Sequence, residues 1–111
     1  MDFSSPTAPL SNSMEERAEE AAAFLKAMAH EGRLMILCHL LEQERTVSEL
    51  EQLISARQSA VSQQLARLRL EGLVENRRNG KVIHYRLADP RTRAMIATLH
   101  DLFCGTGKTS N

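Results

Sequence analysis

The dipeptide Asn79-Gly80 constrains the fold of this chain more than any other feature. It separates two short segments, residues 73–78 and 81–87, that are rich in Val, Ile and Tyr. Asn-Gly between two such segments is a strong hairpin signal, because both residues tolerate the positive φ angles of a type I′ turn. The sequence therefore predicts one β-hairpin with Asn79 and Gly80 as its turn.

Helical patterns lie on both sides of this hairpin. Apolar residues recur at helical spacing in five segments, at about residues 14–28, 30–42, 46–53, 58–71 and 89–104. Ser13 and Asp89 are suitable N-caps for the first and last segments, and either Thr46 or Ser48 suits the third. Gly72 is a suitable C-cap for the fourth. The predicted fold is mainly α, with four helices, a β-hairpin and a last helix.

The length of 111 residues suits a single domain. We place that domain at residues 14–104. Residues 1–13, rich in Ser, Pro and Thr, are predicted to form a disordered N-terminal arm, and residues 105–111 a flexible tail. The chain has neither an apolar segment of about 20 residues that could span a bilayer nor the pattern of a secretory signal. We expect a cytoplasmic protein with no membrane partner.

The charges are balanced in number but not in position. The chain has 14 basic and 14 acidic residues, with the acidic ones in excess over residues 14–53 and the basic ones over residues 57–86. A basic segment of this kind is expected of a protein that binds nucleic acid, although ordinary solvated charge would give the same pattern.

The outward face of the fourth predicted helix favours nucleic acid. Its inner stripe is Val61, Leu65 and Leu68. The opposite face carries short or amide side chains where a solvated helix usually carries Glu and Lys, and its members are Gln58, Ser59, Ser62, Gln63 and Arg67. Such side chains can enter a major groove and exchange hydrogen bonds with base edges. The third and fourth helices therefore predict a helix-turn-helix unit that reads double-stranded DNA.

Basic residues surround the predicted hairpin turn. Arg77, Arg78 and Lys81 can contact phosphate or enter a minor groove. Positive charge can also protect an edge strand from aggregation. The position directly after a recognition helix favours a DNA-binding wing.

These motifs together resemble the ArsR/SmtB repressors. The resemblance rests on residues 27–34, 59–68, 71–74, 77–81 and 85–87, and extends over about residues 15–104. It implies a winged helix-turn-helix homodimer, joined through the first and last helices, that binds an inverted repeat in operator DNA. It also implies base reading by Gln58, Ser59, Ser62 and Gln63.

The usual metal sites of that family are incomplete in this chain. No cysteine stands at residues 46–49, where the family has a Cys-x-Cys pair, and Asp89 is followed by Arg91 where the family has His. We therefore expect no metal site of the usual kind and no cofactor. Two thiolates and an imidazole would still suit a soft metal, so a metal- or haem-responsive repressor using Cys38, Cys104 and a histidine remains an alternative.

Cys38 and Cys104 are the only cysteines of the chain. One cysteine in the second helix and one at the end of the last resemble the BigR/SqrR branch, which responds to persulfides and polysulfides. The resemblance implies that a disulfide or a longer sulfur chain joins them. His39 and His100 are secondary candidates to increase their thiolate population, and the alternative is that each cysteine is a small buried apolar residue.

The DNA-binding motifs together with this resemblance imply a thiol-switched transcriptional repressor whose effector is reactive sulfur. The sequence contains no nucleophile–base motif and no phosphate-binding loop, so we expect no enzymatic activity. A protein-binding module with a vestigial winged helix is the other alternative.

Overall fold

The computed structural model describes residues 13–55 and 58–105. Its elements, in chain order, are α1 (Met14–Met28), α2 (Glu31–Glu42), β1 (Arg45–Thr46), α3 (Val47–Ile54), α4 (Gln58–Leu70), β2 (Val74–Asn79), β3 (Val82–Leu87) and α5 (Pro90–Cys104). The predicted five helices and hairpin are confirmed. Apart from Ser13 and Gly105, the predicted N-terminal arm and C-terminal tail lie outside the described residues.

The helices begin at the residues whose side chains can cap them. Ser13 Oγ accepts a hydrogen bond from the Glu16 amide at 3.2 Å. Thr46 and Glu49 form a reciprocal capping box at the start of α3, with distances of 3.2 and 2.9 Å. Asp89 caps α5, which has Pro90 in its first turn. Thr46 rather than Ser48 is therefore the cap of α3.

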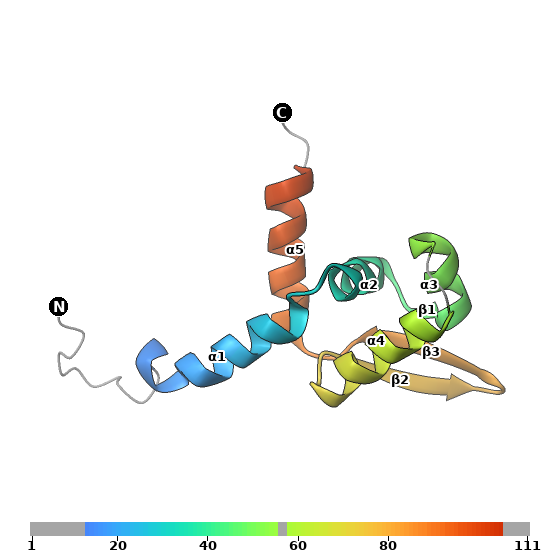
Figure 1. Cartoon of the computed structure of the whole chain (residues 1–111), viewed down its shortest axis with the longest axis horizontal. Helices are drawn as coiled ribbons and strands as arrows, with labels where there is room; N and C mark the ends of the chain where they lie inside the picture. Colours follow the sequence, from blue (N-terminus) through green and yellow to red (C-terminus); the bar gives the residue numbers. More distant parts are fainter. Residues whose placement is uncertain (1–12, 56–57, 106–111) are drawn as a thin grey trace.

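The core lies between α2 and the elements that pack against it, α3, α4, α5 and β3 (Figure 1). Seven Leu and Ile side chains of the described residues are almost completely buried in it: Ile36, Leu37, Leu40, Leu50, Leu65, Leu68 and Ile96. The predicted inner stripe of α4 is confirmed, since Val61 is buried as well. This burial fixes the rotation of α4 about its axis and turns its polar face outward.

The hairpin turn differs by one residue from the predicted turn. Asn79 pairs with Val82 across the antiparallel ladder, so the two turn residues are Gly80 and Lys81. Gly80 has a φ of 71°, whereas neither Asn79 nor Lys81 has a positive φ. The predicted type I′ turn is wrong: glycine at the first turn position is the preference of a type II′ turn. As a result, Lys81 stands at the tip of the hairpin.

A two-residue strand, β1, completes the sheet and was not predicted. It pairs antiparallel with β3, Arg45 opposite Tyr85, and the strand order is β1-β3-β2. Two residues are too few to show an alternating pattern in sequence. This strand ties the start of the helix-turn-helix unit to the middle of β3.

Helix α1 lies largely outside the core. Of its residues only Ala27 and Met28 are buried, and Figure 1 shows it extending away from the other helices. Its link to α5 is Arg91, which forms an ion pair with Glu20 at 3.3 Å and lies over the ring of Phe24 at 5.5 Å. None of the described helices is both long and apolar enough to cross a membrane.

Candidate DNA interface and cysteine pair

The outward face of α4 presents uncharged hydrogen-bonding side chains. Ser62 and Gln63 are exposed, and the first turn of the helix contains no acidic residue. Among the described residues, neither side chain forms a hydrogen bond within the protein. The side chains of Gln58 and Ser59 lie outside the described part of the structure. Ser62 and Gln63 are thus sterically available to a base edge.

Unlike Gln63, the neighbouring Gln64 forms a side-chain hydrogen bond within the protein. Its Oε1 accepts a hydrogen bond of 2.9 Å from Arg33 Nε, and Arg33 Nη1 donates to the carbonyl of Ala27 at 2.9 Å. Arg33 is half-buried and so joins the end of α1, the start of α2 and the middle of α4. The sequence alone did not indicate this contact, because its partners are far apart in the chain.

Arg67 lies one turn after Gln63 on the exposed side of α4. It faces Glu71 with an Nε–Oε2 distance of 3.6 Å, an ordinary exposed i,i+4 pair. Such a pair holds Arg67 weakly, so its guanidinium can turn to another anion.

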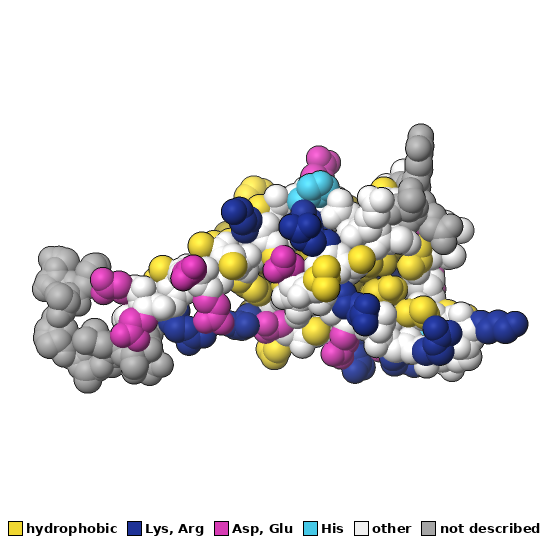
Figure 2. Space-filling model, turned by 60° about the horizontal axis from the view of Figure 1, so that its bottom comes forward, with side chains coloured by type: hydrophobic (Ala, Val, Ile, Leu, Met, Phe, Trp, Pro, Cys, Tyr) yellow, Lys and Arg dark blue, Asp and Glu magenta, His cyan; other side chains and the backbone are white. Residues whose placement is uncertain are grey.

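The three basic residues of the predicted wing have different surroundings. Arg77 donates to both carboxylate oxygens of Glu44, the residue before β1, with its closest contact at 2.9 Å. Arg78 and Lys81 are exposed and, in the described part of the chain, form no ion pair. Figure 2 shows Lys and Arg dominating the hairpin end at the right, while acidic and basic side chains mix over the rest of that face. Of the three basic residues of the wing, Arg78 and Lys81 are therefore the two without an ion pair in the described part of the chain.

Glu44 is the centre of an ion-pair cluster at the base of the wing. Besides Arg77 it faces Arg86 at 3.6 Å, and Arg86 pairs with Glu75 at 2.6 Å. The hydrogen bonds from Arg77 lower the pKa of the Glu44 carboxyl, so it stays ionised at neutral pH. The basic segment seen in the sequence is thus partly neutralised by acidic residues from elsewhere in the chain.

The two cysteines lie on helices that pack against each other, α2 and α5. Both thiols are free, with Cys38 half-buried and Cys104 exposed in the last turn of α5. Burial raises the pKa of the Cys38 thiol, and the charges of Cys104 and Glu42 raise it further. The two cysteines thus lie on neighbouring helices, and Cys104 is one of the groups that raise the pKa of the Cys38 thiol.

His39 and His100 are not among the groups that shift the pKa of the Cys38 thiol. The direction of that pKa shift is away from the thiolate. His39 Nε2 is buried and has no hydrogen-bond partner among the described residues. The hypothesis that these histidines increase the thiolate population of Cys38 is therefore not supported.

The described residues of a single chain contain no cluster of side chains that could form a metal site. Over residues 13–55 and 58–105, no three side chains of His, Cys, Asp or Glu come together to hold an ion. The alternative of a metal held by both cysteines and a histidine has no geometric basis there.

Comparison with known proteins gives consistent matches. Residues 30–76, from the cap of α2 into β2, match the family described as "Bacterial regulatory protein, arsR family". The "Biofilm growth-associated repressor" of Xylella fastidiosa strain 9a5c is 46% identical over 86% of this chain and 83% of its own. The "Transcriptional activator HlyU" of Vibrio cholerae is 46% identical over 82% of this chain and 84% of its own.

Solved structures agree in fold with this chain. The transcriptional repressor BigR from Xylella fastidiosa has a TM-score of 0.78 and 47% identity, over 82% of this chain and 93% of that one. Reduced HlyU from Vibrio cholerae has the same TM-score at 46% identity, over 82% of this chain and 96% of that one. All these proteins are named as regulators of transcription, which confirms that the chain is not of an enzyme family.

Proposed function

Because this chain belongs to the arsR family of bacterial regulatory proteins, we propose that it is a transcriptional repressor switched by its two thiols. As a homodimer with reduced cysteines it binds double-stranded operator DNA. It releases the DNA when reactive sulfur bridges Cys38 and Cys104. The observation that carries this proposal is that two free thiols lie on helices that pack against each other, α2 and α5.

The polar face of α4 supports the assignment of base reading. With Val61, Leu65 and Leu68 buried, Ser62 and Gln63 face outward in the half of the helix that enters a major groove in helix-turn-helix proteins. Gln is suited to a bidentate contact with adenine. Gln58 and Ser59, at the start of the same helix, belong to the proposed reading surface by the family resemblance.

The wing supports a second contact, with the DNA backbone. Arg78 and Lys81 lie at or beside the hairpin turn and are free of ion pairs within the described chain. Arg77 and Arg67 join this surface once phosphate displaces their partners Glu44 and Glu71. Contacts of this kind add affinity without sequence preference.

The exposed apolar residues of α1 and α5 support a homodimer. Leu102 is 72% exposed, Phe103 81% and Leu25 51%, on two helices that a single chain leaves largely uncovered. Isolated small domains rarely expose such side chains in a group. A twofold pairing of these helices would cover them and would place two α4 helices against successive half-sites of an inverted repeat.

The different exposure of the thiols suggests an order of reaction. The Cys104 thiolate attacks a sulfur of a polysulfide, one S–S bond breaks, and its electron pair leaves on the shortened polysulfide anion. Cys104 then carries a short sulfur chain. The Cys38 thiolate attacks the sulfur next to Cys104 Sγ, and the remaining end of the chain leaves as an anion, with hydrosulfide as the smallest case. Zero-valent sulfur of the polysulfide is the oxidant, and a trisulfide bridge is the product.

A sulfur bridge would affect DNA binding because it would join α2, which supports the DNA-reading helix, to α5, the helix of the proposed dimer contact. Cys38 lies in a helix of the core that supports α4, and Cys104 lies at the end of the proposed dimer helix. Joining them would change the angle between the two α4 helices of a dimer. For the bridge to change the DNA affinity substantially, bridging and DNA binding must be coupled by a free energy of about 1–3 kcal/mol.

The proposal is tested by light scattering and a DNA shift on the same reduced protein, before and after polysulfide. We expect a dimer that binds operator DNA and loses affinity on treatment, with recovery after a thiol reductant. A reduced protein that stays monomeric at DNA-binding concentration contradicts the assembly, and an unchanged shift after treatment contradicts the switch.

A further inference from the structure

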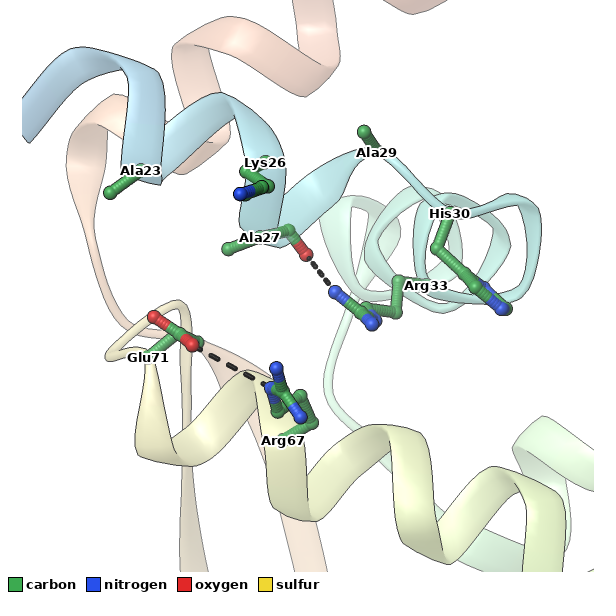
Figure 3. Close-up of a pocket in the computed structure, with 8 residues that line it drawn as sticks. All are labelled: Ala23, Lys26, Ala27, Ala29, His30, Arg33, Arg67 and Glu71. Carbon is green, nitrogen blue, oxygen red and sulfur yellow. Dashed lines mark hydrogen bonds and ion pairs between the residues drawn. The ribbon is translucent and has the colours of Figure 1, made fainter. Parts of the chain in front are cut away.

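A surface cavity of about 400 Å³ lies where the end of α1, the start of α2 and the second half of α4 meet. Figure 3 shows the residues that line it, which come from these elements. Neither cysteine is among them, nor are Ser62 and Gln63. Small side chains, Ala23, Ala27 and Ala29, leave the space open. Of the lining residues only Arg67 has been given a ligand above, a DNA phosphate, and the cavity as a whole has none.

The polar lining of this cavity is mostly basic. Lys26 comes from α1, Arg33 from α2 and Arg67 from α4, while Glu71 is the single carboxylate among the described lining residues. In Figure 3, Arg33 and Arg67 reach toward the space between α2 and α4 from opposite sides. Like charges that face one space repel each other unless an anion lies between them.

Hydrogen-bond donors remain available on both guanidinium groups. Arg33 uses Nε for Gln64 and one Nη1 proton for the Ala27 carbonyl, and these two bonds fix its position. An arginine has five N–H donors, so three of them remain. Arg67 is held only by the 3.6 Å contact with Glu71. One fixed and one adjustable guanidinium, with an ammonium beside them, suit an anion that accepts several hydrogen bonds.

We propose that the cavity formed by Lys26, Arg33 and Arg67 binds a phosphate group. Its volume admits a single phosphate with its hydration or a small phosphate ester. Binding requires the Arg67 guanidinium to turn from Glu71 to the phosphate, and the other residues keep their positions.

Two sources can supply this phosphate, the DNA backbone and a free phosphate compound. Arg67 lies four residues after Gln63, on the same side of α4 and about 6 Å further along its axis. A backbone phosphate that flanks the groove entered by α4 would thus be in reach. The backbone source rests on the proposed DNA binding, whereas the affinity of the cavity for phosphate does not.

The first arm of the test uses the reduced full chain without DNA. Amide NMR spectra are recorded during titration with inorganic phosphate, with chloride withdrawn to keep the ionic strength constant. We expect saturable shifts in residues 26–33 and 67–71, and an affinity about two- to fivefold weaker in Lys26→Gln. The matched control is Arg69→Gln, which removes an exposed charge from α4 outside the cavity and should bind phosphate like the unaltered protein.

The second arm measures the salt dependence of DNA affinity for the same three proteins. If the backbone supplies the phosphate, the slope of log affinity against log salt falls by about 0.9 in Lys26→Gln and stays unchanged in Arg69→Gln. Saturable phosphate binding with an unchanged slope identifies a free phosphate compound instead.

Two results overturn the inference. One is phosphate binding that Lys26→Gln does not weaken, and the other is the absence of saturation together with an unchanged slope. Failure of the chain to bind DNA would remove the second arm and the proposed function, but the first arm would still decide whether the cavity binds phosphate.

Discussion

The guanidinium of Arg77 on the wing is held by the carboxylate of Glu44, 33 residues earlier in the chain, through hydrogen bonds of 2.9 and 3.1 Å. Glu44 immediately precedes β1, so this pair fixes the hairpin to the start of the helix-turn-helix unit. It also occupies a cation that a DNA phosphate would otherwise contact. The Arg77–Glu44 pair therefore stabilises the wing and at the same time reduces the positive charge that the wing can present to DNA.

Replacing Glu44 with Gln should strengthen DNA binding severalfold at most, because it frees Arg77 for phosphate and removes a nearby negative charge. The measurement is DNA affinity as a function of salt. Glu75→Gln is the matched control, since it removes the same charge from the partner of Arg86 and leaves the Arg77 pair intact. Equal gains in the two variants would show that Arg77 is not the residue released.

Replacing Gln63 with Ala should cost about 1–3 kcal/mol of operator binding and relax discrimination at one base position, because its exposed amide is placed to read a base. The affinities for operator and random DNA are compared. Gln64→Ala is the control on the adjacent residue: it breaks the bond with Arg33 and should lower thermal stability while base discrimination is retained. A loss in Gln63→Ala that is the same on both DNAs contradicts base reading.

Replacing Arg78 with Ala should weaken binding to all DNA sequences alike, because we propose that this exposed arginine beside the hairpin turn contacts phosphate rather than bases. The slope of log affinity against log salt should decrease by about 0.9 for each lost contact. A loss confined to the operator would place Arg78 at a base edge instead.

The helices and their outward faces could be predicted from local signals, since capping residues and apolar spacing act within a few residues. The hairpin was predicted as well, but the turn lies one residue later, because the pairing of Asn79 with Val82 leaves Gly80 and Lys81 as the turn. Strand β1 is too short to carry a pattern of its own.

Contacts between distant segments could not be predicted. The pairing of Arg77 with Glu44 and of Arg33 with Gln64 depends on how the helices and sheet pack. The same is true of the cavity proposed to bind phosphate, whose basic residues come from three helices. The pairing of Cys38 with Cys104 was predicted from resemblance to a family, whereas the packing of their helices, α2 on α5, is visible only in the structure.

Cys104 should be alkylated faster than Cys38 in the reduced protein, because Cys104 is exposed and burial raises the pKa of Cys38. The alkylation rate of Cys38 should therefore rise with pH to an inflection above the ordinary pKa of a thiol. In Cys104→Ser that inflection should move down, since one of the charges that raise the pKa of Cys38 is gone. Rates at each cysteine are followed by peptide mass analysis over a range of pH, and faster alkylation of Cys38 would reverse the proposed order of attack.

The central claim is tested most directly by intact mass and DNA affinity, measured on one sample of the dimer after polysulfide treatment. We predict a bridge of one or more added sulfurs between Cys38 and Cys104, with a loss of DNA affinity in proportion to the bridged fraction. Cys38→Ser should keep DNA binding, gain only an open sulfur chain on Cys104, and stay bound to DNA. Release of DNA by Cys38→Ser under the same treatment would contradict the paired-thiol switch.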